Sequence, residues 1–132
     1  MIDHQLFGQL TFSRHDGWIN SSFTAFGCSG IELLIDAGPE GPTLQQVEAF
    51  KNFSHKHESV LSESTKRLQD TRSEMQLPPG TFVLSGITIP SYKPEPQGKL
   101  WTLWFDCPED EHFMFGVQSD DEWQTLHPFA DD

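Results

Sequence analysis

The stretch Thr43-Leu-Gln-Gln-Val-Glu-Ala-Phe50 (TLQQVEAF) begins a long segment with helical periodicity, which separates two groups of strand-like sequence. Thr43 and Gln46 have the spacing of a capping box, in which each side chain bonds the backbone amide of the other residue. Apolar residues then recur every three or four positions to about residue 75. One helix of that length would be about 45 Å long, which is longer than a small domain needs. We therefore expect a break near residues 52–54.

Strand patterns lie on both sides of this segment. Alternating apolar and polar residues and β-branched runs predict six strands, over residues 6–12, 18–26, 31–36, 82–89, 99–107 and 112–118. Three prolines predict a surface loop over residues 90–98. The order of three strands, a helix or helix pair, and three strands predicts one α+β domain over residues 1–132. We expect an antiparallel sheet of about six strands with the helices packed on one face.

The composition predicts a globular protein. Eleven Phe and four Trp in 132 residues supply apolar surface for a core. The first residues show neither the basic nor the apolar region of a signal peptide, and no apolar run has the length of a membrane span. We therefore expect a cytoplasmic protein, in which Cys28 and Cys107 are reduced; no disulfide is assumed.

The charge of the chain is strongly acidic and unevenly distributed. The net charge is -12, and residues 100–132 contain nine Asp or Glu and no Lys or Arg. Such a field repels nucleic acids and anionic lipids and attracts basic proteins. We expect no nucleic-acid partner and no membrane partner, and the simplest alternative is a surface that serves solubility alone.

The stretch Trp104–Val117 (WFDCPEDEHFMFGV) concentrates carboxylates, a cysteine and a histidine. A metal-site hypothesis would use Asp106, Glu109, Glu111 and His112, with Cys107 as a further ligand. Their spacing matches neither a calcium loop nor a zinc site. Consecutive acids at a turn point apart, which disfavours paired general acid and base catalysis. We therefore expect no metal, no cofactor and no enzyme, and a solvated hairpin tip over residues 108–111 stays the plain alternative.

Trp104 is the ambiguous aromatic residue of this stretch. Alternation along the strand places Trp101, Leu103 and Phe105 on one face and Trp104 with Asp106 on the other. Trp104 is then either covered by helices or exposed as a binding anchor, and the burial preference of aromatic residues favours the core.

Six short motifs occur in order along most of the chain. They are Phe7-Gly-Gln-Leu-Thr-Phe12, Gly17-Trp18, Ile35-Asp-Ala37, Gly41-Pro-Thr-Leu-Gln-Gln-Val-Glu-Ala-Phe50, Cys107 with Glu111-His112, and Gly116-Val117. Together they resemble a bacterial family catalogued mainly as a domain of unknown function. Family members usually carry a tryptophan between the cysteine and the Glu-His pair, and a glycine after it. This chain has Pro108-Glu-Asp110 and Phe113 instead.

The resemblance implies a binding role. Such domains are similar to small proteins encoded beside polymorphic or contact-delivered toxins, some of which are regarded as immunity proteins. We therefore expect an immunity protein that neutralises a basic toxin or effector by tight one-to-one binding. The candidate contact residues are Asp106, Glu109, Asp110, Glu111, Asp120, Asp121, Glu122 and Trp123, with Trp104 in addition. Two alternatives stay open: an interaction module with no toxin partner, and a metal-dependent enzyme that uses Glu111 and His112.

Overall fold

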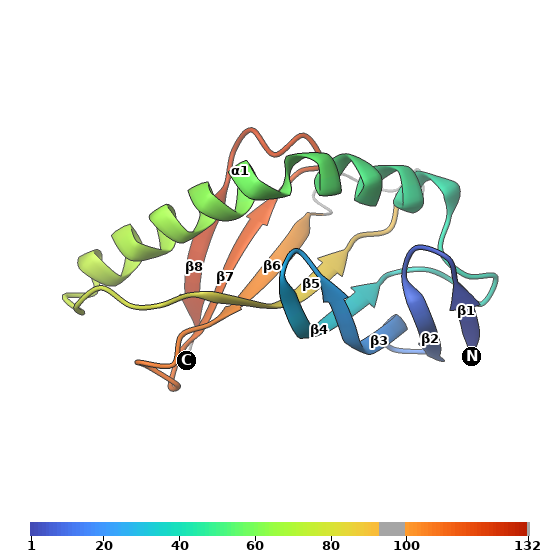
Figure 1. Cartoon of the computed structure of the whole chain (residues 1–132), viewed down its shortest axis with the longest axis horizontal. Helices are drawn as coiled ribbons and strands as arrows, with labels where there is room; N and C mark the ends of the chain where they lie inside the picture. The colour runs from blue at the N-terminus through green and yellow to red at the C-terminus, as the bar shows by residue number, and fades with distance from the viewer. Residues whose placement is uncertain (93–99, 132) are drawn as a thin grey trace.

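The computed structural model describes residues 1–92 and 100–131, which form an eight-stranded sheet and one long helix (Figure 1). The strands are β1 (Ile2–His4), β2 (Gly8–Ser13), β3 (Gly17–Ala25), β4 (Cys28–Ile35), β5 (Val83–Ile89), β6 (Trp101–Asp106), β7 (Met114–Ser119) and β8 (His127–Asp131). The helix α1 is Leu44–Glu74. The strands lie in chain order, and neighbours are antiparallel except β4 and β5, which are parallel and joined through α1. The predicted α+β class is confirmed.

The sheet has two strands more than predicted, one at each edge. β1 has three residues and pairs with β2. Its turn is closed by His4, whose Nδ1 accepts from the amides of Leu6 and Phe7 at 3.1 and 3.3 Å. β8 contains Pro128, which is compatible with an edge strand because one side of the strand has no ladder to complete. Neither edge has the alternation that marks a strand in sequence.

The predicted break in the helix is wrong, since α1 is continuous from Leu44 to Glu74. Polar residues at and just after the predicted break bond within the helix: Ser54 Oγ donates to Phe50 O at 2.9 Å, and His57 Nδ1 lies 2.7 Å from Ser54 O. Phe50 and Phe53 stay buried through the same turn. The helix is about 46 Å long, and the axes of the outermost of eight strands are about 34 Å apart. The helix is therefore long enough to extend across the whole width of the sheet.

The start of α1 is anchored to the sheet as well as capped. The capping box is confirmed, with Thr43 Oγ1 accepting from the Gln46 amide at 3.2 Å and Gln46 Oε1 accepting from the Thr43 amide at 3.0 Å. Gln46 is fully buried, and its Nε2 donates to Asp36 O at 2.8 Å and to Pro90 O at 3.0 Å. One side chain therefore fixes the helix to the ends of β4 and β5.

The core lies between α1 and one face of the sheet (Figure 1). Inward residues of the central strands are fully buried, among them Leu33, Ile87 and Trp101. Trp101 Nε1 donates to Tyr92 Oη at 2.6 Å, and burial raises the pKa of Tyr92 to about 12. Most of the loop predicted over 90–98 lies outside the described residues. Within the described chain, α1 lacks the apolar character of a membrane-spanning helix.

Candidate functional site

The sheet face opposite α1 carries a row of residues that runs across five strands. Glu32 of β4, Gly86 of β5, Trp104 of β6, Gly116 of β7 and Phe129 of β8 are successive cross-strand neighbours. Sequence neighbours of Trp104 are buried under α1, and side chains alternate along a strand, so this row faces away from the helix. We call this side of the sheet the open face.

Two glycines make room for the aromatic rings of the row. A Cβ at Gly116 would overlap the Phe129 ring, and a Cβ at Gly86 would lie 3.1 Å from Trp104 Cδ1. The Trp104 and Phe129 rings pack edge to face, with centroids 5.5 Å apart and planes at 89°. Trp104 Nε1 donates to Thr88 Oγ1 at 3.3 Å. The half-buried indole is therefore held in a fixed position at the surface.

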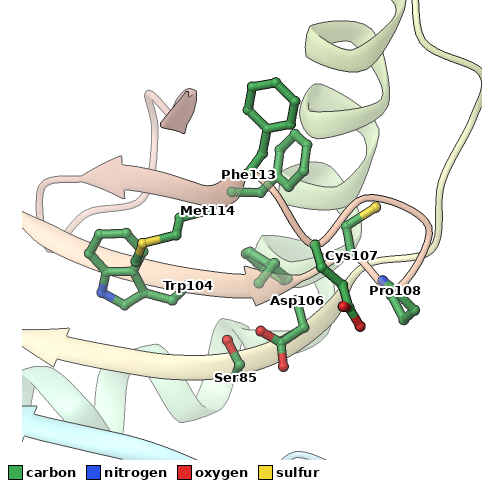
Figure 2. A pocket seen from close by; sticks show the side chains of 10 residues that line it. Ser85, Trp104, Asp106, Cys107, Pro108, Phe113 and Met114 are labelled. Carbon is green, nitrogen blue, oxygen red and sulfur yellow. The ribbon is translucent and has the colours of Figure 1, made fainter. Parts of the chain in front are cut away.

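Two hollows adjoin Trp104 and share Ser85 and Met114 as lining residues. The hairpin hollow, of about 410 Å³, extends toward the β6–β7 connection and is also lined by Asp106, Cys107, Pro108, Glu111 and Phe113 (Figure 2). The slot, of about 350 Å³, lies over Gly86 and is completed by Glu32, Leu34 and Thr88. Met114 is 59% exposed. The open face thus presents apolar surface together with carboxylates.

The carboxylates around these hollows have no cationic partner in the described part of the chain. Glu32, Asp106 and Glu111 are exposed, and the ion pairs among residues 1–92 and 100–131 all involve Lys or Arg side chains of α1. None of those pairs includes a carboxylate of the open face. An unneutralised acidic border around an aromatic patch is suited to a cationic ligand.

The predicted contact residues Glu109 and Asp110 are bound within the protein. Glu109 accepts from the Thr81 amide at 2.8 Å and from its hydroxyl at 2.9 Å, and these hydrogen bonds lower the pKa of Glu109 to about 2. Asp110 Oδ2 lies 3.6 Å from Nη1 of Arg72, which is only 2% exposed. The tip of the β6–β7 hairpin is therefore fastened to the last turn of α1 and the loop after it.

Arg72 is the centre of this attachment, which we call the hairpin anchor. Its Nε donates to Pro78 O at 2.8 Å, its Nη1 lies 3.5 Å from Cys107 Sγ, and its guanidinium sits 5.9 Å from the Phe115 ring centroid. Burial raises the pKa of Cys107, whose thiol donates to Glu109 Oε1 at 3.6 Å. Cys107 and Cys28 are both free thiols.

The third group of predicted contact residues lies at the other end of β7. Asp120 Oδ1 accepts from the amides of Glu122 and Trp123 at 3.1 and 3.2 Å, which orders the β7–β8 connection. Asp121 and Glu122 are exposed. Trp123 is 8% exposed and packs against Phe53 and Trp101, with centroids 4.8 and 5.1 Å away. The length of β7, about 20 Å, separates this group from the hairpin hollow.

The structure therefore brings together only three of the predicted residues, Trp104, Asp106 and Glu111, on the open face. It adds Glu32, Met114 and Phe129, which sequence analysis did not select. Glu32 was accessible to prediction, because it alternates with inward residues in the predicted strand 31–36. Phe129 could not be predicted to join the site, because its strand, β8, was not among the six strands predicted from the sequence.

Glu111 and His112 are both exposed at the hairpin. Among residues 1–92 and 100–131, no group of three or more His, Cys, Asp or Glu is arranged to hold a metal ion.

Comparisons with protein-family models, with curated proteins and with solved structures find no match to this chain.

Proposed function

We propose that this chain is an immunity-type protein, which binds a basic bacterial toxin or effector in the cytoplasm and blocks it without chemistry of its own. The open face is the proposed contact surface. One observation carries the proposal: an aromatic and thioether patch of Trp104, Met114 and Phe129 lies exposed or half-buried beside carboxylates that have no described cationic partner.

The charge distribution supports a basic partner. α1 contains five acidic and five basic residues, whereas the rest of the chain contains fifteen acidic and three basic residues. The entire net charge of -12 therefore lies outside the helix. A field of one sign accelerates encounter with an oppositely charged partner, and the effect weakens as salt screens it.

The aromatic patch supplies the short-range part of the proposed interface. Large aromatic residues at the centre of an interface carry much of its binding energy, while charges around them determine orientation and association rate. The toxin as the partner class follows from the motifs that resemble the bacterial family. Gly116, which belongs to one of those motifs, lies in β7 and is part of the row across the open face.

The proposal is tested by isothermal titration of this protein against the product of the adjacent gene, prepared as an inactive variant if it is toxic. We expect one-to-one binding with a nanomolar dissociation constant that weakens when salt is raised. A Trp104→Ala variant should bind more weakly, while Lys66→Met on the outer surface of α1 should bind as the native chain does. No binding at either salt concentration would contradict the proposal.

The same experiment separates the immunity role from a general interaction role. If the bound product is toxic alone and harmless when the two genes are expressed together, neutralisation is established. Tight binding of a product that has no toxicity would instead favour an interaction module without a toxin partner.

A further inference from the structure

We propose that the slot over Gly86 is a receptor site for one arginine side chain of the partner. The inference rests on the proposed function for the source of the arginine, but its chemistry is testable without that partner. The slot runs between β4 and β6, with Glu32 on one side and Trp104 on the other.

The backbone register creates the slot. Gly86 lies directly between Glu32 and Trp104 in the cross-strand row, so no side chain separates the carboxylate from the indole. Strands are about 4.8 Å apart, which leaves a gap of about two strand spacings between the backbones of β4 and β6. Leu34 and Thr88 lie at one end, and Ser85 and Met114 at the other. A residue larger than glycine would fill the floor and push against Trp104.

The chemistry of the slot fits a guanidinium group. A guanidinium is planar, stacks on an indole face, and donates two parallel hydrogen bonds to a carboxylate. Trp104 supplies the aromatic group and Glu32 supplies the carboxylate. Leu34 and Met114 give apolar surface for the three methylenes of an arginine side chain. A lysine ammonium is more strongly hydrated and has no planar face, so the slot should favour arginine.

The protein supplies no occupant of its own among the described residues. Apart from Arg14, the Lys and Arg side chains of residues 1–92 and 100–131 belong to α1, which covers the opposite face of the sheet. Arg14 lies in the turn between β2 and β3. Glu32 takes part in none of the described ion pairs, and its negative charge is complementary to a cationic side chain of the partner.

The test uses the intact protein labelled with ¹⁵N and three blocked tripeptides, Gly-Arg-Gly, Gly-Lys-Gly and Gly-citrulline-Gly. Citrulline has the shape of arginine without its charge. The indole signal of Trp104, assigned with a Trp104→Phe variant, reports on the slot. The indole N–H groups of Trp18 and Trp101 donate to Gly38 O and Tyr92 Oη inside the protein and serve as references.

We expect the arginine peptide to shift the Trp104 signal saturably while the two reference signals stay fixed. The lysine peptide should bind about threefold more weakly, because an ammonium has no planar face to stack on the indole, and the citrulline peptide should not saturate. Glu32→Gln should weaken arginine binding about threefold or more, as expected for loss of one charge pair. Glu122→Gln changes the net charge equally at the far end of β7 and should leave binding unchanged.

The inference would be overturned by no shift at Trp104, by an equal response to arginine and citrulline, or by equal weakening by Glu32→Gln and Glu122→Gln. If Asp106→Asn together with Glu111→Gln weakened binding of the arginine peptide while Glu32→Gln did not, the cation would lie in the hairpin hollow. That result would also overturn the proposal that arginine binds in the slot. Gly86→Ala should abolish the shift. Its amide spectrum checks the fold, and Glu32→Gln keeps the test decisive if that variant fails to fold.

The outcomes for the two proposals are distinguishable. Peptide binding in the slot without binding of the adjacent gene product would uphold the arginine site and contradict the proposed partner. Tight binding of that product, unaffected by Glu32→Gln, would uphold the proposed function and contradict the arginine site.

Discussion

Two pairs of carboxylates in the β6–β7 hairpin differ in what they do, although they lie within six residues of sequence from Asp106 to Glu111. In the hairpin anchor, Glu109 accepts hydrogen bonds from Thr81, and Asp110 forms an ion pair with Arg72. Asp106 and Glu111 border the hairpin hollow and have no ion-pair partner in the described chain. A run of acidic residues is therefore not one surface, because the role of each carboxylate depends on which groups the fold places against it.

The largest effect should come from breaking the hairpin anchor with Arg72→Met. Asp110 would lose its counter-ion and Pro78 O its donor in a nearly closed site. We expect the free energy of unfolding to fall by about 3 kcal/mol, as when one partner of a buried pair is removed. Urea denaturation measures this loss. The exposed pair of Lys66 with Glu63 is the control, and Lys66→Met should cost under about 0.5 kcal/mol. Equal losses in the two variants would contradict a structural role for Arg72.

The opposite pattern is expected for Trp104→Ala on the open face. Removal of a half-buried indole should cost the partner complex about 2 kcal/mol or more, as for an aromatic hot spot. The free energy of unfolding should fall by less than that. Titration calorimetry and urea denaturation on the same preparations compare the two losses, and Trp104→Phe should retain part of the binding. A loss of stability that exceeds the loss of binding would assign Trp104 to the core instead.

A smaller effect is expected from neutralising the unpaired carboxylates with Asp106→Asn and Glu111→Gln together. The association rate with a basic partner should fall several-fold at low salt and depend less on salt, because steering scales with local charge. Stability should be nearly unchanged. Stopped-flow binding at two salt concentrations gives the rates, with Asp121→Asn and Glu122→Gln as an equally charged control. Equal slowing by both pairs would mean that total charge acts, not the open face.

The smallest effect concerns the pH dependence of the anchor through Glu109. Its folded pKa of about 2 lies below the ordinary value of 4.5, so its hydrogen bonds with Thr81 contribute stability that is fully present above about pH 5. That contribution is lost as pH falls from about 4.5 toward 2. Comparing urea midpoints of the native chain and Glu109→Gln at several pH values tests this sign. The difference should shrink in acid, and a difference that grows there would contradict the assignment.

Local patterns predicted the inner part of the fold. The capping box at Thr43 and the six inner strands follow from neighbouring residues, which determine turn chemistry and the alternation of side chains. The edge strands did not follow, because three residues in β1 and a proline in β8 leave no periodic signal. The break in α1 was predicted because a helix of about 45 Å is long for a small domain, and an eight-stranded sheet is wide enough to pack against such a helix.

The candidate site was predictable only in part, for a related reason. Trp104 and Asp106 share a strand face, and period-two alternation placed them together. Glu32 and Phe129 join them only through pairing across β4 to β8, which no local pattern contains. Likewise, the engagement of Asp110 depends on Arg72, which is distant in sequence and buried against expectation for a charged residue.

The parallel ladder of β4 with β5 gives the arginine slot a place in the folding of the chain. Strands β1 to β4 and strands β5 to β8 are two meanders in which pairing is between sequence neighbours. Within the described sheet, only the β4–β5 ladder joins the two meanders. It pairs Glu32 with Gly86, and the whole of α1 lies between these two residues in the sequence. Contacts of such sequence separation are costly to close and form slowly. Because the slot spans this seam, a ligand there binds only the joined sheet and stabilises it by mass action. Occupancy would therefore hold the two halves together and slow their separation.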